Sequence, residues 1–309
     1  MTARRGGHNR DTRRCLAAVV LALGSLTATA CNSAHRPENI VVAETDARGR
    51  SARLLSAFYG LDDNLPFGAH LLCLGGGGTD GMPVILSHTV DDETLDAEDF
   101  RVLTRGGAAK TPLCATLFPA TDAGEGRTVL LIGDLGSATE DPPLTVTVVG
   151  DLVSDGRSGG PVNFKGQTVA VTPLQAGPSL VLAEVVPSEI WTVSGRGSAC
   201  PRDSRQVVRV TWEGGVRRPD GENAGDRERE LYRVTVRRAD GSLEVIRPDV
   251  LAELGDNDNN HLLCMNTVDP VVAVAFPGGY LVDPNQDRNP DTRIELTGGN
   301  NQGNSPPDA

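Results

Sequence analysis

The sequence predicts an all-β protein made of two β-sandwich modules in tandem, with little helix. Short runs rich in β-branched residues recur along the chain, and runs such as 144–148 and 232–236 alternate apolar with other residues, as strands buried on one face do. Many of the 36 Gly and 20 Pro lie between these runs, where a sandwich places its turns. The predicted strands are 82–86, 100–103, 128–132, 144–149, 168–171, 180–185, 206–212, 231–237 and 271–276.

The first 30 residues predict a signal peptide. Arginines at positions 4, 5, 10, 13 and 14 precede an apolar run at 16–26, which is too short to span a membrane permanently. The pair Arg13-Arg14 also resembles the twin-arginine export signature. Export by that route or by the general secretory route therefore stays open.

The end of this segment, Ala28-Thr29-Ala30-Cys31, resembles the lipobox of bacterial lipoproteins, in which the cysteine is acylated and the chain is cut just before it. The resemblance implies that Cys31 carries a lipid and holds the protein at the extracytoplasmic face of a membrane. That family usually has Leu where this chain has Ala28. The same residues also fit ordinary signal peptidase cleavage after Ala30, which would release a soluble protein.

Without this leader the chain is strongly acidic. Residues 1–30 hold five of the 29 Lys and Arg and one of the 41 Asp and Glu, so the remainder carries a formal charge of −16. Nucleic acid and anionic lipid surfaces are therefore poor partners. The expected partners are a membrane, through the lipid anchor, and an envelope partner that the sequence does not identify.

Residues 31–67 are expected to form a tether and a short helical lead-in at 50–59, and residues 68–176 a first sandwich. Within it, segments 83–87, 90–95 and 99–102 resemble the bacterial Ig-like domains of surface-layer and adhesin proteins. Those domains begin with a strand, turn through an acidic segment ending in Thr-Leu, and enter the next strand at a Phe. The resemblance implies an Ig-like sandwich used for spacing or adhesion, and it carries over no catalytic residue.

Residues 177–297 predict a second sandwich related to the first. The segment His70-Leu71-Leu72-Cys73 recurs as His261-Leu262-Leu263-Cys264, and each copy is followed by a Pro-led apolar strand and an acidic turn. Because the chain ends soon after the second copy, this sandwich must take other strands from 180–246. A further short helix is expected at 248–254, and residues 298–309 are expected to form a disordered tail.

Four cysteines remain once Cys15 and Cys31 are set aside. Cys73, Cys114, Cys200 and Cys264 are an even number, lie in apolar stretches and lack the close spacing of zinc or redox motifs, so disulfides or buried thiols are expected. Four cysteines allow three connectivities. We predict Cys73 with Cys114 and Cys200 with Cys264, because each pair then lies inside one module.

Gly156-Arg157-Ser158-Gly159-Gly160-Pro161 resembles the segment around the nucleophile of chymotrypsin-like serine proteases. Such a site also needs a His base and an orienting Asp, with the His far upstream in a separate barrel. His70 and His88 are too close to Ser158 in sequence for a barrel to fit between, and no strand precedes His35. A glycine-rich turn explains the same residues. A serine hydrolase using Ser158 is therefore the alternative function.

One acidic segment has the composition of a calcium loop, with side-chain oxygens on Asp283, Asn285, Asp287 and Asp291. An EF-hand is excluded, because Arg288 occupies the place of its invariant Gly. The competing interpretation is a solvated turn rich in Asx and Pro. Calcium is accordingly the single candidate cofactor. The sequence as a whole favours an exported, membrane-anchored, non-enzymatic envelope lipoprotein that binds a partner or acts as a spacer.

Overall fold

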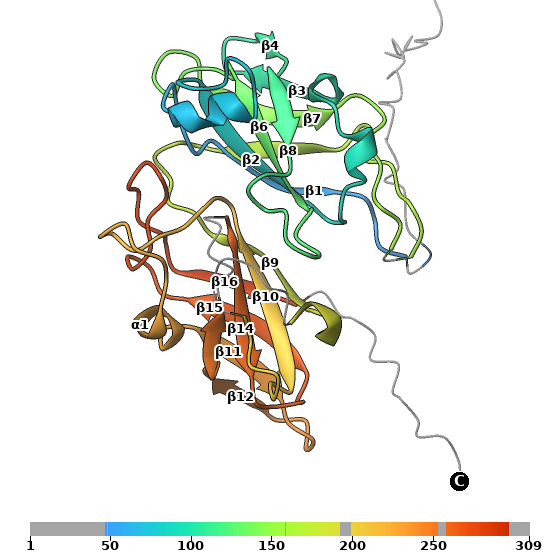
Figure 1. Ribbon diagram of the computed structural model, residues 1–309, viewed down its shortest axis with the longest axis vertical. Coiled ribbons are helices and arrows are strands. Elements are labelled where there is room, and N and C mark those ends of the chain that lie inside the picture. Colours follow the sequence, from blue (N-terminus) through green and yellow to red (C-terminus); the bar gives the residue numbers. More distant parts are fainter. Residues whose placement is uncertain (1–46, 48, 158, 192–198, 253–257, 297–309) are drawn as a thin grey trace, which may run out of the picture. The chain divides into compact units, whose positions relative to one another are not determined.

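The computed structural model describes residues 47, 49–157, 159–191, 199–252 and 258–296, and this part of the chain is all-β, as predicted (Figure 1). It contains sixteen strands, one short α-helix, α1 (Asp226–Arg229), and four 3-10 helices. None of its helices is long and apolar enough to cross a membrane. The predicted signal peptide, Cys31 and the predicted tail at 298–309 lie outside the described residues.

The first sandwich contains β1 to β8, coloured blue to green in Figure 1. Its strands pair in the order β4-β3-β7-β8-β1-β2-β6-β5. β8 pairs antiparallel with β7 through its first half and parallel with β1 through Val171 and Thr172, so it joins the two faces. The strands are β1 (Leu54–Phe58), β2 (Asp80–Leu86), β3 (Phe100–Thr104), β4 (Ala109–Lys110), β5 (Cys114–Thr116), β6 (Thr128–Gly133), β7 (Pro143–Val148) and β8 (Thr168–Thr172).

The second sandwich has two four-stranded sheets, ordered β13-β14-β10-β9 and β12-β11-β15-β16. Numbered from one to eight within each sandwich, the strands take the same order in both: 5-6-2-1 on one face and 4-3-7-8 on the other. This is the strand order of the Ig fold, so the prediction of tandem Ig-like sandwiches is confirmed. The strands are β9 (Leu180–Val185), β10 (Gln206–Trp212), β11 (Arg233–Arg237), β12 (Leu243–Ile246), β13 (Val250–Ala252), β14 (Asn260–Met265), β15 (Val271–Phe276) and β16 (Thr292–Glu295).

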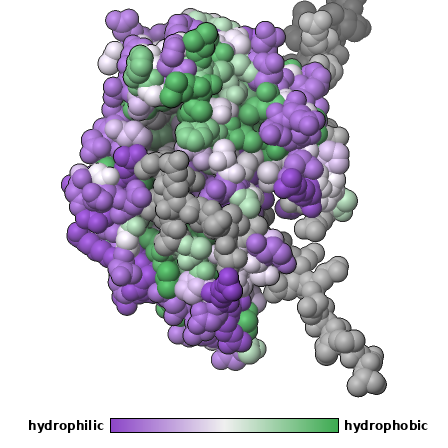
Figure 2. All heavy atoms as spheres, in the orientation of Figure 1, coloured by the Kyte–Doolittle hydropathy of each residue, from purple (hydrophilic) through white to green (hydrophobic). Residues whose placement is uncertain are grey.

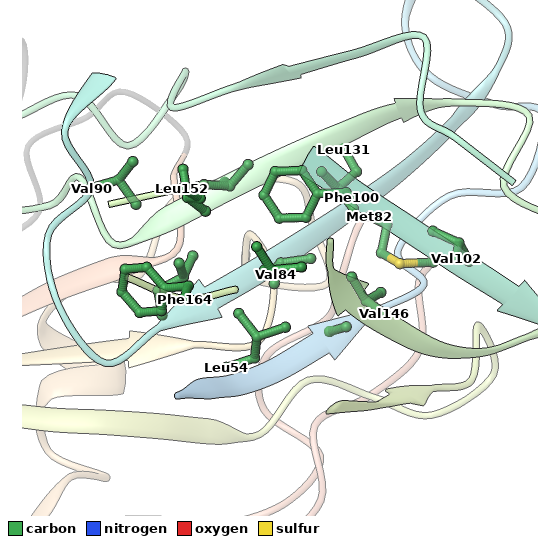
Figure 3. Close-up of a cluster of buried hydrophobic side chains, with 14 of the residues drawn as sticks. Leu54, Met82, Val84, Val90, Phe100, Val102, Leu131, Val146, Leu152 and Phe164 are labelled. Atoms are coloured by element: carbon green, nitrogen blue, oxygen red, sulfur yellow. The ribbon is translucent and has the colours of Figure 1, made fainter. Parts of the chain in front are cut away.

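Figure 2 shows polar residues over much of one face of the protein and hydrophobic residues gathered over part of the first sandwich. Beneath the surface, each sandwich buries its own apolar core. In the first, Phe100, Val102 and Val146 from one face meet Met82 and Val84 from the other (Figure 3). These residues occupy alternate positions of their strands, which is the pattern that predicted the strands.

Both predicted helices are wrong. The segment 50–59 contains β1, which pairs with β2 and β8, and 248–254 contains β13, which pairs with β14. Strand pairing and burial override the helix propensity of Leu and Ala in such short segments. Because β1 belongs to the first sandwich, that module begins before residue 68, and the described residues ahead of β1 contain no helix. The predicted boundary at 177 falls between Thr172 at the end of β8 and Leu180 at the start of β9.

The sequence repeat pairs the wrong elements, although the modules are related. His70 and Leu71 end a 3-10 helix, η1 (Phe67–Leu71), in the loop before β2, whereas His261 and Cys264 lie on β14, the sixth strand of its sandwich. The first six strands of the second sandwich come from 180–265. The alignment of the segment at His70 with the segment at His261 therefore rested on similar apolar composition and not on equivalent positions in the two sandwiches.

A chain of buried polar side chains crosses the second core. Trp212 Nε1 donates to Tyr232 Oη at 3.2 Å, and Tyr232 Oη lies 2.8 Å from His261 Nδ1. Burial lowers the pKa of His261 to about 4, so its imidazole is neutral at physiological pH. Its Nδ1 therefore accepts a hydrogen bond from the hydroxyl of Tyr232. Phe276 packs against the rings of Trp212 and Tyr232.

Tyr232→Phe should lower the free energy of unfolding by about 2 to 4 kcal/mol, because Trp212 Nε1 and His261 Nδ1 would both lose a buried partner. Urea unfolding measures the difference. The matched control is Tyr280→Phe, since that ring is 37% exposed. Equal stability of the two variants would contradict the role of the Tyr232 hydroxyl.

His261 should make the protein less stable as the pH falls from about 6.5 towards 4. In this window the unfolded chain binds a proton at His261 and the folded chain does not, so acid favours unfolding by up to about 3 kcal/mol. His261→Asn keeps a hydrogen-bonding side chain but does not titrate. Unfolding measured at several pH values should show that wild type loses more stability than the variant across this window, and identical slopes would contradict the prediction.

Candidate functional sites

The two disulfides have the predicted pairing, Cys73 with Cys114 and Cys200 with Cys264. Cys73 and Cys200 each lie in the segment between the first and second strands of their sandwich, while Cys114 starts β5 and Cys264 lies on β14. Each bond therefore ties the same connection to the same face of its own sandwich. Cys73 corresponds to Cys200, not to Cys264 as the sequence repeat indicated.

The bonds close loops of 41 and 64 residues. By the chain-entropy model, loops of this length contribute about 4 kcal/mol each to the free energy of unfolding. That is a large fraction of the roughly 5 to 15 kcal/mol that stabilises a whole domain. Each sandwich therefore depends on an environment in which its disulfide stays oxidised.

The loop that carries Cys73, residues 65–79, is compact. Its ends pair through Leu65 N to Thr79 O at 2.9 Å and Gly78 N to Leu65 O at 2.8 Å. Leu65 and Cys73 pack on Ile132 in a small core of their own. Three apolar side chains of the same loop are exposed instead of buried: Phe67, Leu71 and Leu74 are 84%, 91% and 81% exposed.

The predicted calcium residues form two separate hydrogen-bonded turns. Asp283 Oδ1 accepts from Asp287 N at 2.8 Å, and Asn285 Nδ2 donates to Asp287 Oδ2 at 2.7 Å. Asp291 instead accepts from Gly278 N at 2.9 Å. Across the described residues, no three His, Cys, Asp or Glu side chains are grouped closely enough to hold a metal ion. The structure thus brings Asp283, Asn285 and Asp287 together as a turn and leaves Asp291 outside it.

Asp283 is the unusual member of this turn. It is 2% exposed, and its Oδ2 has no hydrogen-bond partner. Burial raises the pKa of its carboxyl to about 6, with the nearby Asp287 charge acting in the same direction. The folded protein therefore favours the protonated carboxyl more strongly than the unfolded chain does.

Asp283→Asn should make the protein more stable than wild type at pH 8, by about 1 to 3 kcal/mol. The stability that Asp283 contributes is present below pH 4 and is lost as the pH rises through about 6. The side-chain amide of an asparagine at this position would still accept the hydrogen bond from Asp287 N but would carry no charge. Thermal unfolding at pH 4.5 and pH 8 measures this, with the exposed Asp291→Asn as control. A calcium-dependent stabilisation of wild type that Asp283→Asn removes would instead support a cation site.

Ser158 lies outside the described residues, but the chain on either side of it is placed. Val90 forms a β-bridge with Ser154, and Asp155 N donates to Thr89 O at 2.9 Å. The chain entering the glycine-rich loop therefore runs beside the segment that carries His88. The sequence had excluded His88 because too few residues separate it from Ser158 for a barrel to fit between, and the structure places its segment beside the chain that leads to Ser158.

His88 itself is buried. It is 2% exposed, its ring meets Phe164 edge-on, and its Nδ1 lies 2.9 Å from Ser87 Oγ. In the triad arrangement the equivalent nitrogen faces a carboxylate. His70, the other upstream histidine in the described residues, accepts from Gly75 N within the loop 65–79 that carries Cys73.

Sequence reasoning missed one buried ion cluster. Glu184 accepts from Arg127 Nη2 at 2.8 Å and from Arg209 Nη2 at 3.4 Å. Both arginines are less than a tenth exposed, and burial lowers the pKa of Arg127. Arg127 precedes β6, while Glu184 and Arg209 lie on β9 and β10, so the cluster links the two sandwiches. Charged residues on outward strand positions are normally solvated, so the sequence carries no signal for it.

Comparison with known proteins gives no family for this chain: no family model and no curated protein matches it. Among solved structures, the crystal structure of the S-layer protein rSbsC(31-844) is similar over 75% of this chain and 42% of that chain, with a TM-score of 0.25 and 10% sequence identity. This chain thus spans less than half of that protein's length. At this TM-score the likeness bears on neither fold nor function.

Proposed function

We propose that this protein is an exported envelope lipoprotein, anchored in a membrane through Cys31, whose two Ig-like sandwiches serve as a non-enzymatic binding or spacer module. Its place is the extracytoplasmic side of that membrane. The observation that carries the proposal is the pair of disulfides, one inside each sandwich.

Disulfides persist in oxidising compartments and are rare where thiols are kept reduced. Here both bonds lie within structured cores, since Cys73, Cys200 and Cys264 are all buried. Export also agrees with the basic and apolar segments at 1–30 and with the small residues before Cys31. Two separately cored sandwiches joined by the short segment between Thr172 and Leu180 support the spacer role.

The anchor is tested by metabolic labelling with radioactive palmitate. Wild type and Cys15→Ser should incorporate the label, because Cys15 is removed with the leader, whereas Cys31→Ser should not. Non-reducing peptide mapping of the envelope-bound protein should recover the Cys73–Cys114 and Cys200–Cys264 peptides.

Equal release of wild type and Cys31→Ser into the medium, without label, would overturn the anchor and favour cleavage after Ala30. Four free thiols in the mature protein would overturn export into an oxidising compartment.

A second candidate, a serine hydrolase using Ser158, is favoured by the pairing that brings the chain on one side of Ser158 beside the His88 segment. A fluorophosphonate probe distinguishes the two functions. Under the non-enzymatic proposal, wild type is not labelled. Labelling that Ser158→Ala abolishes and the exposed-site control Ser242→Ala retains would establish the hydrolase instead.

A further inference from the structure

We propose that the loop from Leu65 to Thr79 inserts its apolar tip into a lipid bilayer, so that the first sandwich docks on the membrane surface. The apolar tip is defined as Phe67, Leu71 and Leu74. The inference rests on the proposed function in one respect, that a membrane lies within reach.

The tip is exposed without being part of any core. None of the residues of η1 is buried, and the three tip side chains are more than 80% exposed. The neighbouring Leu72 and Leu113 are 48% and 52% exposed, so the apolar surface extends past the tip. The light blue coil in Figure 1 marks η1 on the first sandwich.

The loop holds the tip in place. The Cys73–Cys114 disulfide and the backbone pairing of Leu65 with Thr79 fix its base. Gly76 lies so close to the base that an added Cβ would be 2.9 Å from Ile132 Cγ2 and 3.0 Å from Cys73 Cβ. Because the backbone is already ordered, little conformational entropy remains to be lost when the tip is buried by a partner.

The chemistry of the loop suits hydrocarbon. In a chain with 23% charged residues, no Asp, Glu, Lys or Arg occurs from residue 65 to residue 79. Insertion of the tip therefore removes no Asp, Glu, Lys or Arg side chain from water, and the transfer of such side chains into a bilayer is expensive. The remainder of the chain is acidic, which favours a zwitterionic surface over an anionic one.

A bilayer fits the size of the tip better than a protein does. Three exposed apolar side chains offer roughly 500 Å², whereas a stable protein interface buries about 800 Å² on each partner. A bilayer needs no matched surface, and each inserted side chain contributes separately.

The tip can reach the membrane that holds Cys31. From Cys31 to Ala47, whose N donates to Gly159 O at 2.7 Å, the chain can extend up to about 55 Å. From Ala47 to the end of β1 at Phe58 the chain spans at most about 36 Å, and the loop begins soon after that end. A lipid anchor and an inserted loop would together supply two contacts with one membrane.

The test uses the mature chain from residue 31 with Cys31→Ser, so that it carries no lipid, and vesicles of phosphatidylcholine. The folded protein should co-sediment with the vesicles. The triple variant Phe67→Ser/Leu71→Ser/Leu74→Ser should bind them at least about tenfold more weakly. Phosphatidylglycerol in the vesicles should not strengthen binding. Brominated lipids should quench a larger share of the tryptophan fluorescence in a Leu71→Trp variant than in the same protein with Leu71.

The matched control replaces three other exposed apolar residues, Leu243, Val245 and Val268, with Ser and should bind vesicles like wild type. Circular dichroism and disulfide mapping check that every variant is folded. No vesicle binding by folded wild type, or equal binding by the tip variant, would overturn the proposal. Self-association that the tip variant abolishes, without vesicle binding, would overturn it in favour of a second copy as occupant.

The Cys31→Ser protein used in the vesicle test carries no lipid. Failure of that test therefore leaves the proposed anchor at Cys31 untouched. Failure of palmitate labelling would likewise leave the vesicle result standing.

Discussion

Both sandwiches depend on the burial of apolar side chains between two strand faces. In the first core, Val102 and Val146 meet Met82 and Val84, and in the second, Trp212, Tyr232 and Phe276 fill the same kind of space. This burial fixes which side of each strand faces inward, because shifting a strand by one residue would turn its apolar side chains to water. Loops that leave the faces are under no such constraint, which lets the connection before β2 expose its side chains while its base stays anchored.

The strands of these cores could be predicted because their alternation is a local property of the sequence. β7 and β11 show it, and the apolar run of β10 was also recognised although every residue of β10 is buried. Alternation alone does not predict the order of strands, since that order depends on pairing between segments far apart in the chain. β1 and β13 were taken for helices for the same reason: their conformation is decided by their neighbours β2, β8 and β14.

The candidate sites show a similar division. The cysteine pairing followed from keeping each bond inside one module, although the repeat that equated Cys73 with Cys264 was wrong. The acidic segment near Asp283 has the composition of a cation loop, but the carboxylates of Asp283 and Asp291 are engaged by backbone amides in separate turns. His88 was excluded because its separation from Ser158 is too short for a barrel to fit between, and strand pairing brings its segment beside the chain leading to Ser158. Composition indicates which groups are present, and only the fold decides which of them meet.

The parallel pairing of β1 with β8 has a mechanical consequence. The chain enters the first sandwich at the start of β1 and leaves it at the end of β8, which are opposite ends of a parallel pair. Tension applied between the chain before β1 and the chain after β8 would therefore pull the two strands past each other, and their hydrogen bonds would bear the load together instead of opening one at a time. In the second sandwich, the corresponding strands β9 and β16 belong to different sheets. Under a pulling force the first sandwich would thus resist through the backbone pairing of β1 with β8, while the second would rely on its core and its disulfide.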